Sequence, residues 1–164
     1  MSALRLLTFF LLLPALCWLA PVWASAGDGL LDGRVFAGRI GPAEAPDLAD
    51  RLYFDEGHFW SGICTDCGFR PGPYTARQTE EGIVFGGVMR SNNRGRFDYR
   101  GIVRSDGTIE VAIRWSQQRW YWTARRDLAF TGKHEAGTTP PDLTAIRARL
   151  TRLDPTGNPR CARF

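Results

Sequence analysis

The residues with the clearest chemical potential are two cysteines three positions apart, in the segment Cys64-Thr65-Asp66-Cys67. A redox enzyme places such a pair at the start of a helix, where the helix dipole lowers the pKa of one thiol. Two glycines and two prolines stand within positions 68–73, so no helix is expected to start there. A zinc site would need a second such pair, which the sequence lacks, and no metal or cofactor is predicted.

Cys161 is the third cysteine after the N-terminal region. The favoured interpretation is a structural disulfide that pins the loop, either between Cys64 and Cys67 or between one of them and Cys161. Because three is an odd number, one thiol is then left free or pairs between two chains. The alternative is a thiol-dependent redox protein that uses Cys64 and Cys67. Neither His58 nor His134 lies in a catalytic motif, and no catalytic residue is predicted.

Aromatic residues form the other chemical signal, because many of them stand in segments with a strand-like pattern. Aromatic side chains on strands mostly fill a core, and in a small barrel the inward set either fills the interior or lines a pocket. A pocket of this kind would bind a small apolar or amphipathic ligand. The side chains expected to line it are those of Phe97, Tyr99, Trp115, Trp120 and Trp122.

The elements that position these residues show the period of two that is typical of half-buried antiparallel strands. Ile109, Val111 and Ile113 alternate with Glu110 and other residues, and turn signals such as Asp106-Gly107 separate the apolar runs. The pattern predicts nine strands, at residues 33–40, 51–55, 58–63, 73–79, 82–90, 95–104, 107–116, 119–124 and 127–133.

The predicted fold class is therefore all-β, an antiparallel up-and-down meander of eight or nine strands over residues 27–136. The connections are short, so strands that follow each other in the sequence are expected to be neighbours in the sheet. Closure into a small barrel would remove both exposed edges. The alternative is a sandwich of two sheets.

Residues 137–164 differ from this body. A linker with two prolines opens the segment, and we expect residues 156–164 to be a flexible tail. A chain that lacks residues 137–164 is expected to fold and to melt almost as the whole chain does. Between linker and tail, four apolar residues have the spacing of a short amphipathic helix, namely Leu143, Ile146, Leu150 and Leu153.

The net positive charge is concentrated in the same segment. Basic and acidic residues balance at fifteen each over residues 27–136, whereas residues 137–164 carry five arginines and two aspartates. A nucleic-acid-binding domain would carry a basic face on its body, so no nucleic-acid partner is expected. The basic tail is suited instead to contact with an anionic surface.

Residues 1–26 have the order of a secretory signal peptide, with one positive charge, an apolar run and a small-residue exit at Ala24-Ser25-Ala26. Cleavage before Gly27 would place the protein in the periplasm or outside the cell. The alternative is an uncleaved segment that anchors the chain in the membrane, because residues 6–23 are just long enough to span a bilayer.

The sequence also resembles a known group of proteins between residues 31 and 133. The similarity lies in glycine, cysteine and aromatic spacing, at Leu52-Tyr53-Phe54, Gly57-His58-Phe59, Cys64, Gly68-Phe69, Trp115 and Leu128-Ala129-Phe130-Thr131-Gly132. In these residues the chain is similar to small exported bacterial proteins of lipocalin-like β type, a group without an assigned activity. The resemblance implies a lipocalin-like barrel and no particular reaction.

Three classes of function remain. The class that fits the sequence best is a non-enzymatic interaction or accessory module of the cell envelope. The first alternative is a periplasmic protein that binds a small apolar or amphipathic ligand in the barrel interior, and the second is the redox protein described above. The partner would accordingly be an envelope protein or a small apolar ligand.

We expect the mature protein recovered from the periplasm to begin at Gly27 or Ser25, because small residues follow the apolar run at these positions. Intact-mass measurement of the purified protein checks this. A mass that still includes Met1 would contradict cleavage and would indicate a chain anchored in the membrane.

Overall fold

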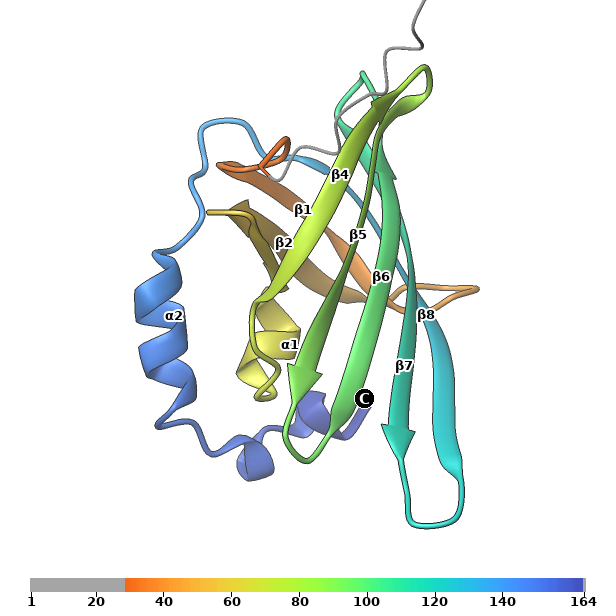
Figure 1. Ribbon diagram of the computed structural model, residues 1–164, viewed down its shortest axis with the longest axis vertical. Helices are drawn as coiled ribbons and strands as arrows, with labels where there is room; N and C mark the ends of the chain where they lie inside the picture. The colour runs from red at the N-terminus through yellow and green to blue at the C-terminus, as the bar shows by residue number, and fades with distance from the viewer. Residues whose placement is uncertain (1–28, 164) are drawn as a thin grey trace, which may run out of the picture.

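The computed structural model describes residues 29–163, which form a closed barrel of eight antiparallel strands (Figure 1). The strands follow one another around the wall in chain order, and the first pairs with the last. They are β1 Arg34–Pro42, β2 Leu48–Asp55, β3 His58–Ser61, β4 Gly72–Thr79, β5 Gly82–Ser91, β6 Gly95–Val103, β7 Thr108–Gln118 and β8 Thr123–His134. The predicted up-and-down barrel is confirmed and the sandwich is wrong. The predicted signal peptide lies outside the described residues.

Strand β7 illustrates why the sequence folds into this wall. Ile109, Val111 and Ile113 are buried, whereas Glu110 and Arg114 between and after them are exposed. Arg114 forms an ion pair on the outer face with a carboxylate of β8. Alternate residues of a strand point to opposite faces of the sheet. The order of apolar and polar residues within β7 therefore decides which side chains face the inside of the barrel.

Aromatic rings fill the interior of the barrel. The ring of Phe54 on β2 contacts those of Phe36, Tyr74 and Phe85, with centroid separations of 5.8, 5.2 and 5.1 Å. All four side chains are at most 2% exposed. Rings that meet edge to face across the interior pack as a core does, which favours filling over a ligand pocket among these residues.

The segment around Cys64 differs from the prediction. The strand expected at 58–63 ends at Ser61, and a short helix, α1 Gly62–Asp66, follows it directly. Ser61 caps this helix, because its side chain accepts a hydrogen bond from the backbone N–H of Cys64. The expectation that no helix starts there is therefore wrong. The glycine at 68, with a φ of 84°, terminates the helix instead of preventing it.

The strand predicted at 119–124 is also wrong. Residues 119–122 form the turn between β7 and β8, and β8 begins at Thr123 and continues through the strand predicted at 127–133. The alternation of aromatic residues in this turn imitates a strand. The pairing of Gln118 with Thr123 shows that the chain reverses between them.

The C-terminal helix α2 Leu143–Leu150 packs against the outside of the barrel (Figure 1). Asp142 caps the helix by accepting from the N–H of Ala145 at 2.6 Å. Leu143 is 1% exposed and Ile146 is 9% exposed, so the predicted apolar stripe is buried in part. Two hydrogen bonds, from Arg147 to His58 and from Arg149 to Thr65, join α2 to β3 and α1.

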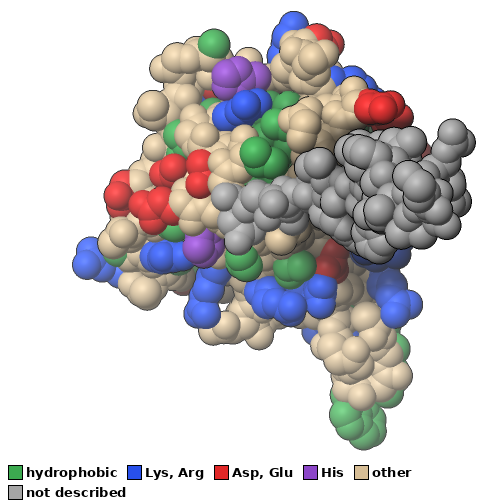
Figure 2. Space-filling view, turned by 45° about the horizontal axis from the view of Figure 1, so that its top comes forward, with side chains coloured by type: hydrophobic (Ala, Val, Ile, Leu, Met, Phe, Trp, Pro, Cys, Tyr) green, Lys and Arg blue, Asp and Glu red, His purple; other side chains and the backbone are tan. Residues whose placement is uncertain are grey.

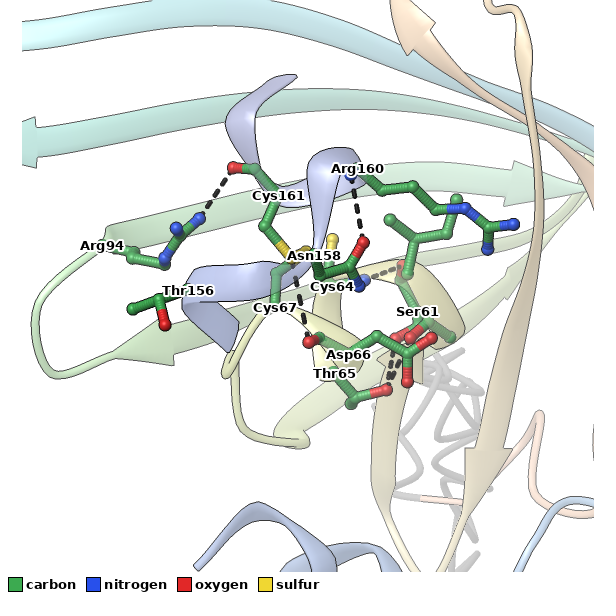
Figure 3. Close-up of a disulfide and its surroundings, with 12 residues drawn as sticks. Ser61, Cys64, Thr65, Asp66, Cys67, Arg94, Thr156, Asn158, Arg160 and Cys161 are labelled. Atoms are coloured by element: carbon green, nitrogen blue, oxygen red, sulfur yellow. Dashed lines mark hydrogen bonds between the residues drawn. A yellow bond between two sulfur atoms is a disulfide. The ribbon is translucent and has the colours of Figure 1, made fainter. Parts of the chain in front are cut away.

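The segment beyond α2 is structured, which corrects the expectation of a flexible tail. It forms two short 3₁₀ helices, η1 Pro155–Gly157 and η2 Pro159–Arg163. A disulfide joins Cys67, at the end of α1, to Cys161 in η2 (Figure 3). The expectation that residues 137–164 can be removed at little cost therefore loses its basis.

We expect Cys161→Ser to lower the melting temperature of the protein substantially. The disulfide joins residues 94 positions apart, and the loss of a crosslink of that span costs about 5 kcal/mol in the chain-entropy model. For a chain of this size the melting temperature is expected to fall by about 15 °C. Thermal unfolding followed by circular dichroism measures it.

The control for this prediction is the wild-type chain unfolded in the presence of dithiothreitol. Its melting temperature should fall to that of the variant. The variant itself should not respond to the reductant. A reduced wild-type protein that melts within about 2 °C of the oxidised form would contradict a structural role of the disulfide.

Candidate functional site

The most exposed large apolar side chains of residues 29–163 stand together at the end of the β7–β8 hairpin. Trp120 is 94% exposed, Tyr121 79% and Trp122 50%. We call these three residues the aromatic tip. Figure 2 shows hydrophobic side chains at the end of a projection at the lower edge of the molecule. Contiguous exposed apolar surface of this kind is typical of an interaction site.

The hairpin projects from the barrel because its neighbours on both sides end earlier. β6 pairs with β7 only as far as Ser116, and β1 pairs with β8 only as far as Leu128. β7 and β8 continue to pair with each other up to Gln118 and Thr123. We call residues 115–126, with the tip included, the ribbon; beyond Ser116 it has only two strands, and it carries the tip away from the core (Figure 1).

The tip occupies a tight reversal without any residue type that favours turns. The N–H of Arg119 donates to the carbonyl of Trp122 at 2.8 Å, so the chain reverses at Trp120 and Tyr121. The rings of these two residues meet at 90° with centroids 5.6 Å apart. Such reversals usually use Gly, Asn, Asp or Pro. Here the turn residues are bulky and aromatic instead, and their rings are exposed at the surface of the protein.

Hydrogen bonds brace the base of the ribbon. The indole N–H of Trp115 donates to the carbonyl of Arg94 at 2.8 Å, and the amide of Gln117 donates to the carbonyl of Asn93 at 2.6 Å. Both acceptors lie in the turn between β5 and β6. A two-stranded hairpin is marginally stable by itself, so these bonds hold the tip in a defined position.

The ribbon is basic. Residues 115–126 contain Arg119, Arg125 and Arg126 and no acidic residue. The first acidic residue beyond them, Asp127, is paired with Arg114 at 2.8 Å. In the predicted basic tail, Arg149 is paired with a carboxylate of α1. The ribbon therefore combines positive charge with exposed aromatic rings, a combination that the sequence analysis did not assign to it.

The five predicted ligand-binding residues do not lie in one place. Phe97 and Tyr99 are buried inside the barrel, and Trp115 is half-buried opposite Phe97 on the neighbouring strand. Trp120 and Trp122 are exposed, so their expected position inside the barrel is wrong. The error follows from the misassigned strand at 119–124. A role of these residues in binding a ligand stays a prediction.

The three cysteines among the described residues form one disulfide and leave one free thiol. Cys67 pairs with Cys161, one of the pairings left open, and Cys64 is unpaired. The thiol of Cys64 is fully buried, and this burial raises its pKa to about 12. A thiol that is protonated at neutral pH is a poor nucleophile. The arrangement therefore lacks the vicinal pair that the redox alternative requires.

A buried polar network lies beside this thiol. The hydroxyl of Ser61 donates to Asp50 Oδ2 at 2.6 Å, and the N–H of Ile63 donates to Asp50 Oδ1 at 2.9 Å. Cys64 Sγ and the hydroxyl of Tyr99 are 3.3 Å apart. The network joins β2, β3, α1 and β6, and its hydrogen bonds compensate the burial of its polar groups. Sequence reasoning did not find Asp50, because its partners come from other elements.

Asp50 also borders a surface cavity of about 300 Å³. Arg51, Asp66 and Arg160 contribute charged groups to the same cavity. Burial raises the pKa of Asp50 to about 6, against the opposing effect of its hydrogen bonds. Within residues 29–163, no three His, Cys, Asp or Glu side chains converge as they would to hold a metal ion.

Comparisons with known proteins identify no relative of this chain. No family model, curated protein or solved structure matches the chain. None of the helices within residues 29–163 has the length and apolar character needed to cross a membrane. The features of the chain that bear on its function are therefore the aromatic tip, the basic ribbon and the buried network.

We expect Asp50→Asn to remove one component of the pH dependence of stability. A raised pKa means that the folded state binds more protons than the unfolded state between about pH 4 and pH 6. The stability from protonated Asp50 is present below pH 4 and is lost as the pH rises through about 6. The loss amounts to about 3 kcal/mol.

Denaturant unfolding of both proteins across this range measures the difference. An asparagine can accept from Ile63 and donate to Ser61, as the protonated acid does, so the variant should fold. The free energy of unfolding should therefore fall less in the variant than in the wild type between pH 4 and pH 6.5. Parallel pH profiles would contradict the assignment.

Proposed function

We propose that the protein is an exported, non-catalytic β-barrel that attaches to a component of the cell envelope through the aromatic tip. The observation that carries this proposal is the exposure of Trp120, Tyr121 and Trp122 at the end of a braced ribbon. Leaving such side chains in water forgoes roughly 2 kcal/mol each that burial would contribute. Trp and Tyr also dominate the binding energy of interfaces.

The rest of the molecule supports attachment over catalysis. The groups with chemical potential, Ser61, Cys64 and Tyr99, are each at most 1% exposed and hydrogen-bonded to one another or to Asp50. Catalytic groups need access to a substrate. A buried, satisfied network of this kind serves to specify the fold.

The packing also supports attachment over storage of a ligand inside the barrel. Phe59 and Tyr99 touch across the interior with centroids 5.0 Å apart, and Phe69 and Phe97 with centroids 4.6 Å apart. Contacts at these distances leave no room for a ligand between the paired rings. The outer surface then remains as the place where a partner binds.

The test removes the tip without touching the core. We expect the triple variant Trp120→Ser, Tyr121→Ser, Trp122→Ser to sediment with isolated envelope fragments at least about tenfold less than the wild type, because hot-spot residues carry most of the binding energy. The comparison uses the chain from Gly27, which retains every described residue. Co-sedimentation followed by immunoblotting measures the bound fraction.

The matched control is Leu30→Ser, which removes the other exposed large apolar side chain among the described residues, 39% exposed and outside the ribbon. It should sediment as the wild type does. Melting temperatures within about 2 °C show that the variants are folded. Equal sedimentation of the tip variant and the wild type would contradict the proposal.

A further inference from the structure

We infer that the component bound by the aromatic tip is the surface of an anionic lipid bilayer, with the tip inserted between the headgroups. This inference rests on the proposed attachment function and names its partner. It is carried by three independent features of the ribbon, namely its shape, the chemistry of its rings and its charge.

The first feature is shape. The tip is a convex projection, since the chain reverses at Trp120 and Tyr121 and the strands on either side of the ribbon end before it. A rigid partner would need a matching hollow to bury such a projection. A bilayer needs none, because its headgroup region deforms around an inserted side chain.

The second feature is the type of ring. Each of the three tip residues combines a large apolar body with one polar group, the indole N–H of Trp120 and Trp122 and the hydroxyl of Tyr121. Trp and Tyr collect at membrane–water interfaces because this combination satisfies both sides of the boundary. Nothing in the tip is purely aliphatic, as a residue meant for the hydrocarbon centre would be.

The third feature is charge. Arg125 and Arg126 are adjacent on β8, so their side chains leave opposite faces of the ribbon, and Arg119 lies at the base of the turn. Positive charge thus lies on both faces of the ribbon behind the tip, in a segment without acidic residues. Arginine recognises phosphate with two parallel hydrogen bonds. Anionic phospholipids supply phosphate and net negative charge at the depth where these guanidinium groups would lie.

The experiment measures binding of the chain from Gly27 to sedimented vesicles of two compositions. One is phosphatidylcholine alone, and the other contains about 30% phosphatidylglycerol. We expect binding to the anionic vesicles to exceed binding to the neutral ones by about 100-fold, and to weaken with added salt. Tryptophan emission should shift to the blue on binding, because indole rings leave water.

Two variants separate the contributions of rings and charge. The tip variant described above should lose binding to both compositions. The variant Arg119→Gln, Arg125→Gln, Arg126→Gln should lose about 100-fold on anionic vesicles and little on neutral ones. Its matched control removes three charges from exposed positions outside the ribbon and should bind within about twofold of the wild type. It consists of Arg77→Gln, Arg100→Gln and Lys133→Gln.

The outcomes distinguish this inference from the function on which it rests. Absence of vesicle binding, together with tip-dependent sedimentation on envelope fragments, would overturn the lipid inference and indicate a protein or glycan partner. Loss of both would overturn the proposed function as well. Vesicle binding that the tip variant retains, or that the control charges weaken as much as the ribbon charges, would also overturn the inference.

Discussion

The structure depends on one constraint, the closure of the barrel through a very short strand. β3 has four residues and pairs with β4 at only two positions, opposite Gly72 and Pro73. Apolar side chains and backbone groups beside so short a strand need another cover. α1 covers one end, where Ile63 is buried, and α2 covers the outer face, where Leu143 is buried. We call α1, α2 and the η2 segment that the disulfide joins to α1 the cover. The network around Asp50 and the disulfide hold this cover in place.

The wall of the barrel was predictable because its information is local. Whether Ile113 faces inward and Arg114 outward follows from their positions in one strand, and the short connections then determine which strands pair. The cover was not predictable in this way. Cys67 and Cys161 are 94 residues apart, and three cysteines allow three pairings. The stripe that contains Leu143 was recognised, but whether it docks depends on the surface that β3 exposes.

The aromatic tip was misplaced for a different physical reason. Residues 119–124 contain no Gly, Pro, Asn or Asp and alternate in the manner of a strand, so their local preference opposes a turn. The registers of β7 and β8 determine where the chain reverses, through the pair of Gln118 and Thr123. A conflict between local preference and final structure is expected where selection acts on function rather than on folding. The position of the conflict, at the most exposed rings of the described chain, agrees with that expectation.

The cover and the base of the ribbon meet at Arg94, in the turn between β5 and β6. Its guanidinium donates to the carbonyl of Cys161 at 2.7 Å (Figure 3). Its own carbonyl accepts from the indole N–H of Trp115 at 2.8 Å. The disulfide fixes Cys161, Cys161 fixes the turn, and the turn fixes the base of the ribbon. A ribbon that binds through exposed rings loses less conformational entropy on binding if its base is already rigid. The crosslink between Cys67 and Cys161 therefore stabilises the cover of the short strand and, through Arg94, also preorganises the surface that we assign to attachment.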